Sequence, residues 1–321
     1  MSEVLLQTID LEKSFPVRRG FFGQHHFRLM AVDRVNLTIR KGETLGLVGE
    51  SGCGKSTLGL TIMQLYEPTS GSVIFEGQDL TQLSGGALLK KRRQMQMIFQ
   101  DPLASLDPRM TVDEIIREPM DIQDRGSLKN RIQEVGRLLE ITGMPSDAAM
   151  RFPTEFSGGQ QQRIGIARAL ALQPKLMICD EPVSSLDVSV QAQILNLLRD
   201  LQTDFEITYL FISHNIAVTG FMSQRIGVMY LGKLVEVGPS KEIVNEPRHP
   251  YTIALIKAVP VPEPKLKRMK RSLLGDVPSP IDRPSGCPFH PRCPLAKERC
   301  TQEAPQLREL SPDHFVACHF A

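Results

Sequence analysis

The stretch GESGCGKST, residues 49–57, follows directly on the apolar run LGLV, residues 45–48. Four residues separate Gly49 from Gly54, and Lys55 and Ser56 come next, which is the spacing of a phosphate-binding loop between a strand and a helix. Glycine permits the unusual backbone angles and the close amide approach that phosphate oxygens need. A helix that begins at Lys55 would add its positive dipole end. The stretch therefore predicts a nucleotide-binding α/β fold.

Within this loop, each polar group has an expected task. The Lys55 ammonium can reach the terminal phosphates, and the Ser56 hydroxyl can serve as a ligand of Mg²⁺. A chance glycine turn is the alternative, and the complete pattern after a strand disfavours it. The other loop residues predicted to contact the nucleotide are Gly49, Ser51, Gly52, Cys53, Gly54 and Thr57.

A second motif, LMICDE at residues 176–181, ends an apolar run in two carboxylates. A parallel strand delivers such residues to the carboxyl edge of its sheet, where open α/β folds bind ligands. Asp180 is predicted to hold Mg²⁺ and Glu181 to polarise the attacking water as a general base. Two acids that only end a strand are the alternative, which the phosphate loop makes improbable.

A third motif, FSGGQQQR at residues 156–163, precedes the amphipathic run GIARALAL. Ser157 and the amides of Gly158 and Gly159 would then lie at a helix N-terminus, which favours anions. An ordinary helix cap is the alternative reading of this stretch.

Short apolar runs alternate with helical patterns over much of the chain. Buried strands are expected at residues 44–49, 95–100, 175–182 and 208–214, and such alternation predicts a parallel sheet covered on both faces. Apolar residues at helical spacing between the last two runs predict a helix that packs on the sheet; they are Ile194, Leu197, Leu198, Leu201 and Phe205. The segment from about 101 to 171 is expected to be a helical insertion.

Composition limits the classes of function. The 321 residues carry 38 Lys and Arg against 36 Asp and Glu, a formal charge of +2, which argues against a dedicated nucleic-acid binder. No apolar run approaches the length of about 20 residues that a spanning helix needs, and the first ten residues lack signal-peptide features. We therefore expect a location in the cytoplasm and no transmembrane segment.

After Gly238 the composition changes. Residues 260–271 are rich in proline and cations, and residues 276–286 form a turn-rich connector. The expected division is a main domain at 1–245 and an extension at 246–321.

Four of the six cysteines lie near the end of the chain, with five, six and seventeen residues between successive members. They are Cys287, Cys293, Cys300 and Cys318. Four thiolates can hold zinc or an iron–sulfur cluster, and His290 or His319 could join a zinc site, but the close CxxC pairs of many such sites are absent. Unligated thiols in a reducing compartment are the third alternative.

Taken in order, six motifs resemble those of ABC-transporter ATPase subunits: GESGCGKST, Gln100 after MQMIF, FSGGQ, LMICDE, SSLD at 184–187, and SH at 213–214. The resemblance implies a P-loop core with a mostly parallel sheet, an antiparallel β subdomain and a helical insertion. It also implies a head-to-tail dimer in which each ATP lies between the phosphate loop of one subunit and the FSGGQ signature of the other.

The resemblance also assigns further roles. Gln100 would sense Mg²⁺ and couple to membrane subunits, Asp187 would contact the partner across the dimer, and His214 would contact the γ-phosphate. Phe15 matches an adenine-stacking aromatic position, with a buried strand residue as the alternative. The signature residues that would act in trans are Ser157, Gly158, Gly159 and Gln160.

Residues 246–260, EPRHPYTIALIKAVP, look like the C-terminal extension of dipeptide and oligopeptide importer ATPases, and the insertion at 16–33 is similar to that group. Similar cysteine sets in such extensions are associated with a 4Fe-4S cluster. The resemblance thus implies an ATP-hydrolysing subunit at the cytoplasmic face of the inner membrane. Its partners would be a homologous ATPase (a paralogue or a second copy), two permeases and an extracytoplasmic solute-binding protein.

Two alternatives to peptide import remain. The same importer class could carry nickel complexes or glutathione-like solutes. A soluble ABC-type regulatory or nucleic-acid repair ATPase would act without permeases, and the near-neutral charge argues against it.

Overall fold

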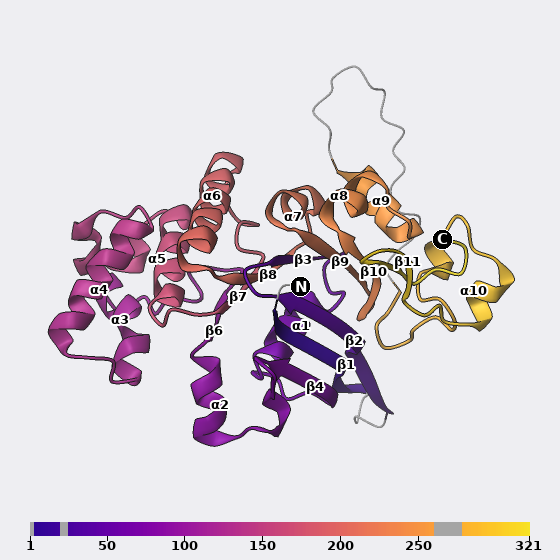
Figure 1. The fold of residues 1–321 in the computed structure, drawn as a ribbon, viewed down its shortest axis with the longest axis horizontal. Coiled ribbons are helices and arrows are strands. Elements are labelled where there is room, and N and C mark those ends of the chain that lie inside the picture. Colours follow the sequence, from indigo (N-terminus) through magenta and orange to yellow (C-terminus); the bar gives the residue numbers. More distant parts are fainter. Residues whose placement is uncertain (1–2, 20–24, 260–277) are drawn as a thin grey trace, which may run out of the picture. The chain divides into compact units, whose positions relative to one another are not determined.

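The computed structural model describes residues 3–19, 25–259 and 278–321. The predicted cationic stretch at 260–271, residues 20–24 of the predicted insertion and the first two residues of the predicted connector lie outside these ranges. The chain folds as two compact units (Figure 1), of which unit 1 is Met1–Arg40, Thr44–Gln82 and Ile212–Ala321, and unit 2 is Lys41–Glu43 and Leu83–Phe211.

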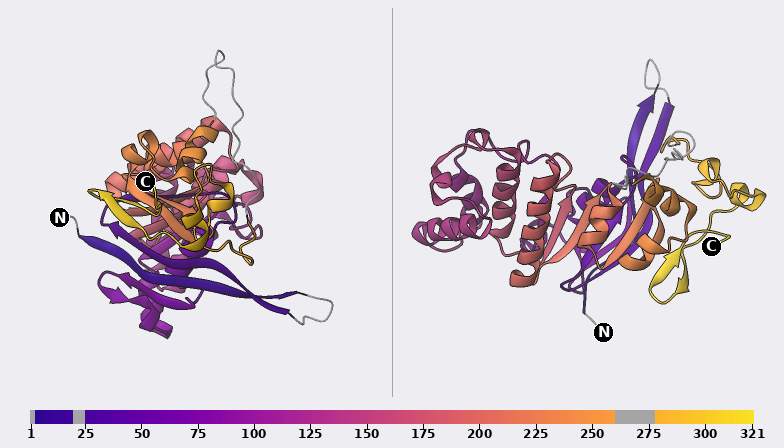
Figure 2. Two further views of the ribbon diagram at one scale, coloured as in Figure 1. Left: turned by 90° about the vertical axis from the view of Figure 1, so that its right-hand side faces the viewer. Right: turned by 90° about the horizontal axis from the view of Figure 1, so that it is seen from above.

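Unit 1 contains an antiparallel sheet in the order β2-β1-β4-β5, which is the antiparallel β subdomain that the resemblance implies. Its strands are β1 (Val4–Arg19), β2 (His25–Arg40), β4 (Ser70–Phe75) and β5 (Gln78–Asp79). The first two strands pair over nearly their whole length, as Figure 2 shows, with Leu6 opposite Ile39 and Phe15 opposite Leu29. Leu6 and Ile39 are fully buried, so this face of the sheet belongs to the core.

A second set of strands in unit 1 follows the order β11-β12-β10-β9-β3. They are β3 (Thr44–Val48), β9 (Arg225–Tyr230), β10 (Lys233–Pro239), β11 (Arg308–Ser311) and β12 (His314–Val316). β3 runs parallel to β9, with Val48 opposite Val228, and both residues are fully buried. β12 pairs antiparallel with β10, so the end of the chain completes this part of the sheet.

The helices of unit 1 are short. They are α1 (Lys55–Ile62), α7 (Ile216–Met222), α8 (Ser240–Asn245), α9 (Pro250–Ala258) and α10 (Glu298–Gln302), with 3-10 turns η1 (Leu80–Gln82) and η4 (His290–Arg292). One hydrophobic core joins Val48 at the end of β3 to Tyr251 of α9 and to Phe289. The strand before the phosphate loop therefore shares its core with the predicted extension. The division into 1–245 and 246–321 stays a prediction.

Unit 2 contains the other three predicted strands, in the order β8-β7-β6, of which the last two residues of β8 belong to unit 1. They are β6 (Met95–Ile98), β7 (Leu176–Asp180) and β8 (Thr208–Ser213), and β6 runs parallel to β7. The parallel pairs confirm the predicted parallel sheet, and β3, β6, β7 and β8 correspond to the four predicted strands.

Helices make up most of unit 2. They are α2 (Gly85–Arg92), α3 (Val112–Ile122), α4 (Leu128–Ile141), α5 (Gly158–Leu170) and α6 (Val188–Phe205), with 3-10 turns η2 (Ser146–Met150) and η3 (Pro153–Glu155). α3, α4 and α5 follow β6 and precede β7 in the chain and pack against one another (Figure 1), which confirms the predicted helical insertion. α6 is the predicted amphipathic helix and buries Ile194, Leu198 and Leu201.

None of the helices in the described parts of the chain combines the length and the apolar character that a bilayer crossing needs.

Candidate functional site

The phosphate loop links β3 to α1 in unit 1, and two of its glycines, Gly49 and Gly54, lie where no side chain fits. A Cβ on Gly49 would lie 2.2 Å from the carbonyl oxygen of Met229, and a Cβ on Gly54 would lie 2.0 Å from that of Ala31. Gly54 also has a φ of 107°, a conformation that residues with side chains rarely adopt. Only glycine at positions 49 and 54 lets the loop backbone pass this close to its neighbours. Ser51 and Gly52, which lie between them, are exposed.

Lys55 lies inside the loop rather than on the surface. Its side chain is in the buried set at 4% exposure, and Nζ donates to the carbonyl oxygens of Gly49, at 2.8 Å, and Glu50, at 3.1 Å. The ammonium is thus fixed at the N-terminus of α1, where helix dipole and lysine favour an anion together. Ser56 and Thr57 follow it, both half-buried. The loop contains the donor groups that a nucleotide phosphate needs.

Cys53 of the loop is buried, with its Sγ 3.9 Å from Nζ of Lys55. Burial raises the pKa of the Cys53 thiol, so it stays protonated and neutral in the loop.

In unit 2, β7 carries the two predicted carboxylates at its carboxyl end. Asp180 is 6% exposed and Glu181 half-buried. The Nε2 atom of Gln100, which follows β6 by two residues, donates to Oε2 of Glu181 at 3.2 Å. Adjacent parallel strands thus bring together two residues that the sequence placed in separate motifs.

Glu181 has a φ of 46°, in the left-handed region that residues other than glycine seldom occupy. The turn that follows holds it there, because the Ser184 amide and hydroxyl both donate to its carbonyl oxygen, at 3.2 and 3.1 Å. Nine other non-glycine residues in the described ranges also have a positive φ, so this conformation alone does not distinguish Glu181.

The FSGGQ signature begins α5, as predicted. The Ser157 amide donates to Oε1 of Gln160 at 3.0 Å, which fixes the first turn while Ser157, Gly158 and Gln160 remain exposed. A Cβ on Gly159 would lie 2.4 Å from Val190 of α6. The signature therefore packs against the start of α6 through Gly159, while Ser157 and Gly158 stay exposed.

The SSLD motif also lies in this region of unit 2. Leu186 is 3.4 Å from the position of a Cβ on Gly158, and exposed Asp187 stands at the N-cap of α6. The structure thus brings the signature and the SSLD motif together, although 27 positions separate Ser157 from Ser184.

His214 lies in unit 1 directly after β8 and is exposed. The next residue, Asn215, caps α7, because its Oδ1 accepts from the amides of Ala217, at 3.0 Å, and Val218, at 3.3 Å. This N-cap accounts for the asparagine and fixes the backbone next to His214.

Phe15 of β1 is half-buried, and its ring lies edge to face with that of Tyr66, with 5.3 Å between centroids. The Nζ atom of Lys13 lies 5.0 Å from the Phe15 centroid. An aromatic platform with a cation beside it suits adenine stacking, and that role stays a prediction.

The four C-terminal cysteines lie in one neighbourhood. Cys287 and Cys300 are buried, Cys293 and Cys318 are half-buried, and the Cys287 amide donates to the Cys300 carbonyl at 2.8 Å. Burial raises the pKa of Cys287 to about 11, and the three other thiols add to this shift. Within the described ranges, however, no group of three or more His, Cys, Asp or Glu side chains is arranged to hold a metal ion.

The histidines proposed as zinc ligands have other partners. His290 Nδ1 lies 2.9 Å from the Cys287 carbonyl, and His319 Nε2 lies 2.9 Å from the Glu303 carbonyl. The described geometry thus gives no support for zinc binding or for the predicted iron–sulfur cluster.

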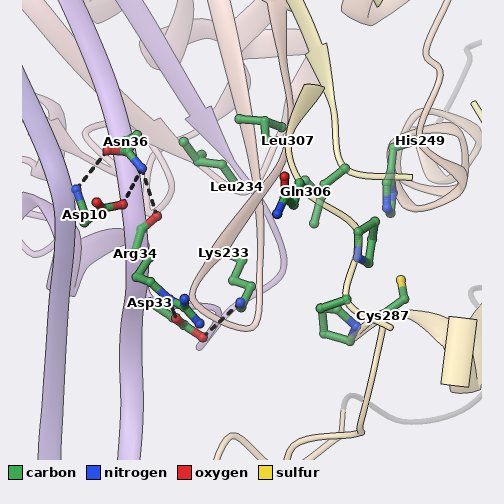
Figure 3. Close-up of a pocket in the computed structure, with 15 residues that line it drawn as sticks. Asp10, Asp33, Arg34, Asn36, Lys233, Leu234, His249, Cys287, Gln306 and Leu307 are labelled. Carbon is green, nitrogen blue, oxygen red and sulfur yellow. Dashed lines mark hydrogen bonds and ion pairs between the residues drawn. The ribbon is translucent and has the colours of Figure 1, made fainter. Parts of the chain in front are cut away.

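A pocket of about 530 Å³ that the sequence did not indicate lies in unit 1 (Figure 3). One wall is charged, where Lys233 pairs with Asp33 at 3.3 Å and Asn36 donates to Asp10 at 2.9 Å. Another wall carries Cys287 and the buried His249. Burial lowers the pKa of His249 to about 3, so this imidazole is neutral near pH 7. The residues that line this pocket come from segments far apart in the chain, so no local sequence pattern could predict the pocket.

Comparison with known families matches two regions of the chain. Residues 32–184 match the family model of the ABC transporter, and residues 235–300 match that of the oligopeptide/dipeptide transporter, C-terminal region.

Two individual proteins are similar in sequence to this chain over almost its whole length. The chain is 50% identical over 320 residues to the oligopeptide transport ATP-binding protein AppF of Bacillus subtilis, covering 99% of this chain and 97% of that protein. It is 51% identical to a probable peptide ABC transporter ATP-binding protein of Sinorhizobium fredii, covering 99% and 90%.

Among solved structures, the chain is similar to a dimeric ATP-binding cassette in a post-hydrolysis state bound to ADP and Pi. The TM-score is 0.65 at 30% identity, over 74% of this chain and 99% of that one. With phosphate loop, paired carboxylates and signature all present on the matching fold, the chain belongs to the ABC transporter ATP-binding family, in the group that carries the oligopeptide/dipeptide transporter C-terminal region.

Proposed function

We propose that this protein hydrolyses ATP to energise the import of dipeptides or oligopeptides through a membrane ABC transporter. The observation that carries this proposal is the joint presence of an ABC ATPase core and the oligopeptide/dipeptide C-terminal region in one chain. A relative that is 50% identical over 99% of this chain is an oligopeptide transport ATP-binding protein. The core supplies the ATPase chemistry, and the C-terminal region supports the assignment to peptide import.

The proposed chemistry assigns one task to each polar group. Lys55 holds the terminal phosphates, and Ser56 and Asp180 would hold Mg²⁺, which would supply positive charge to offset that of the phosphates. Glu181 accepts the proton of the attacking water, and His214 positions the γ-phosphate. Buried Lys55 and the hydrogen bond between Gln100 and Glu181 support these assignments.

A complete reaction needs a second ATPase, whose signature would cover the phosphate loop of the first. The exposed Ser157 and Gly158 support this role, because their polar groups are accessible to a partner. Asp187 is exposed, follows Leu186, which lies near Gly158, and would contact the partner subunit. We propose a homologous cassette as this partner, either a paralogue or a second copy.

Two permeases and an extracytoplasmic solute-binding protein complete the proposed complex, with this chain on the cytoplasmic face of the membrane. ATP binding would close the two cassettes, and hydrolysis would let them part, so that the permeases alternate their access. Residues 1–245 would supply the motor, and residues 246–321 the extension typical of peptide importers.

Reconstitution tests the proposed function directly. In vesicles that contain the permeases, both ATPases and the binding protein, we expect ATP-dependent accumulation of peptides from a panel that also holds nickel complexes and glutathione. Uptake of only the nickel complexes or glutathione would contradict the peptide assignment.

Purification in gentle detergent should recover the chain with integral membrane proteins, whereas recovery with nucleic acid would favour the repair-type alternative.

As a separate hypothesis we propose an iron–sulfur cluster on the four C-terminal cysteines, which lie in one neighbourhood but do not form a ligand set in the described structure. Anaerobic purification should then yield a brown protein with stoichiometric iron and sulfide, and Cys293→Ser should lose the colour. Cys179→Ser is the matched control, because Cys179 is a buried cysteine of β7 outside this group. A colourless wild-type protein without iron and sulfide would remove the hypothesis.

A further inference from the structure

The side chain of Glu50, the second residue of the phosphate loop, is held by an arginine from near the end of the chain. Arg292 Nη1 lies 2.7 Å from Oε2 of Glu50, and Nη2 lies 3.0 Å from Oε1. The Arg292 side chain is 4% exposed and that of Glu50 is 23% exposed. This hydrogen bonding raises the pKa of Arg292 above its usual value. A paired guanidinium fixes both oxygens of a carboxylate in one plane, which a lysine cannot do.

The backbone of Glu50 has a second partner in the same region. Its amide donates to the hydroxyl oxygen of Tyr251 at 2.8 Å, and Tyr251 is fully buried in the HPYT stretch at the start of α9. The carbonyl oxygen of Glu50 accepts from Lys55. Three polar groups of one loop residue thus have partners, two from the C-terminal region and one from the phosphate-binding lysine.

The two groups that contact Glu50, the Arg292 guanidinium and the Tyr251 hydroxyl, belong to or lie against a cluster of packed aromatic rings. Tyr230 lies 4.7 Å from Tyr251 and 5.3 Å from Phe289, and Tyr251 lies 5.4 Å from Phe289, measured between centroids. The Arg292 guanidinium lies 5.9 Å from the Tyr230 centroid, and Nη1 is 3.4 Å from the Tyr230 hydroxyl. All three rings belong to the core that contains Val48, the last residue of β3. Packed rings of this kind restrict the positions of the groups they carry.

We propose that Arg292 and Tyr251 are positioning residues for ATP binding, which hold Glu50 so that the phosphate loop keeps its binding geometry. Arg292 also neutralises a carboxylate that would otherwise repel the phosphates of ATP. Arg292 directly precedes Cys293, so the segment that carries the cysteines also carries this contact to the loop. This inference rests on ATP binding by the loop and is independent of which solute the transporter carries.

Arg292→Met in the full-length chain tests the contact. We expect the Kd for ATP to rise about 10-fold, the order expected for losing a charged hydrogen-bonded pair, with little change in kcat at saturating ATP. Arg299→Met is the matched control: Arg299 precedes Cys300 as Arg292 precedes Cys293, but it is 59% exposed and pairs with Glu303 at 2.8 Å. Arg299→Met should leave the Kd unchanged, and Arg292→Lys should restore part of the affinity.

A double-mutant cycle separates positioning from general destabilisation. Adding Glu50→Gln to Arg292→Met should cause no further loss of affinity, because both changes remove the same ion pair and the second also removes the carboxylate that Arg292 no longer neutralises. Losses that multiply would overturn the proposal, as would an Arg292→Met protein with a lowered Tm and an unchanged Kd.

Glu50→Gln and Tyr251→Phe provide a test if Arg292→Met does not fold, since the first removes the charge that pairs with Arg292 and the second removes the hydroxyl that accepts from the Glu50 amide, each with little change in volume. Both should raise the Kd for ATP several-fold, and an unchanged Kd in both would overturn the proposal. Because the readout is nucleotide affinity, a failure of peptide transport in the reconstituted complex would contradict the proposed solute without altering this result.

Discussion

Glu181→Gln is expected to lower ATP turnover about 100-fold or more, the usual scale for the loss of general-base help, while ATP binding is retained. The amide keeps the size of the carboxylate and can still face Gln100, whose Nε2 lies 3.2 Å from Oε2 of Glu181. It cannot accept a proton from water. Single-turnover hydrolysis and equilibrium ATP binding on the same preparation would separate the two effects.

The control for this variant must account for the backbone at Glu181, which has a φ of 46°. Glu206 offers the same residue type in the same conformation, with a φ of 52° at the end of α6, and it is exposed. Glu206→Gln should leave turnover near the wild-type value. If Glu181→Gln also hydrolysed ATP at a near-normal rate, the base would have to be another group.

The strands and helices near the motifs could be predicted because their patterns are local. β3 and β7 are short apolar runs that end in chemically distinctive residues, and both are buried at every position. α6 shows its apolar stripe at helical spacing. In each case the residues that decide the structure lie within about one element length of one another, so a single sequence contains enough information.

The edge of the sheet in unit 1 could not be predicted in this way. β12 is three residues long and is defined by its pairing with β10, where Glu236 stands opposite Val316, 80 positions away. β11 is four residues long and largely exposed, so it shows little hydrophobic pattern. Strands of this kind are specified by tertiary partners rather than by their own residues.

In the site, too, contacts within one motif could be predicted from the sequence, whereas contacts between distant segments could not. Lys55 contacts the carbonyl of Gly49 six positions earlier, so the motif itself contains the contact. The contact between Arg292 and Glu50 spans 242 positions, and an arginine before a cysteine has no distinctive pattern. The geometry of the cysteines was equally inaccessible, since spacing fixes neither their distances nor their ligands.

Lys55→Ala is expected to weaken ATP binding about 100-fold, because charge-assisted contacts contribute about 1.5–3 kcal/mol each and 1.4 kcal/mol is a factor of ten. The substitution removes the ammonium that would meet the phosphates, and it leaves the carbonyls of Gly49 and Glu50 without the donor that now lies 2.8 and 3.1 Å away. Equilibrium titration with ATP measures the change.

Lys241→Ala provides the comparison, because Lys241 is an exposed lysine in α8 of the same unit and should leave affinity unchanged. Equal ATP affinity in Lys55→Ala and Lys241→Ala would contradict the phosphate role of Lys55. The expected loss also exceeds the 10-fold effect of Arg292→Met, since Lys55 would touch the nucleotide whereas Arg292 acts through Glu50. A reversal of that order would mean that the loop binds ATP mainly through its backbone amides, with the lysine serving only to hold the loop closed.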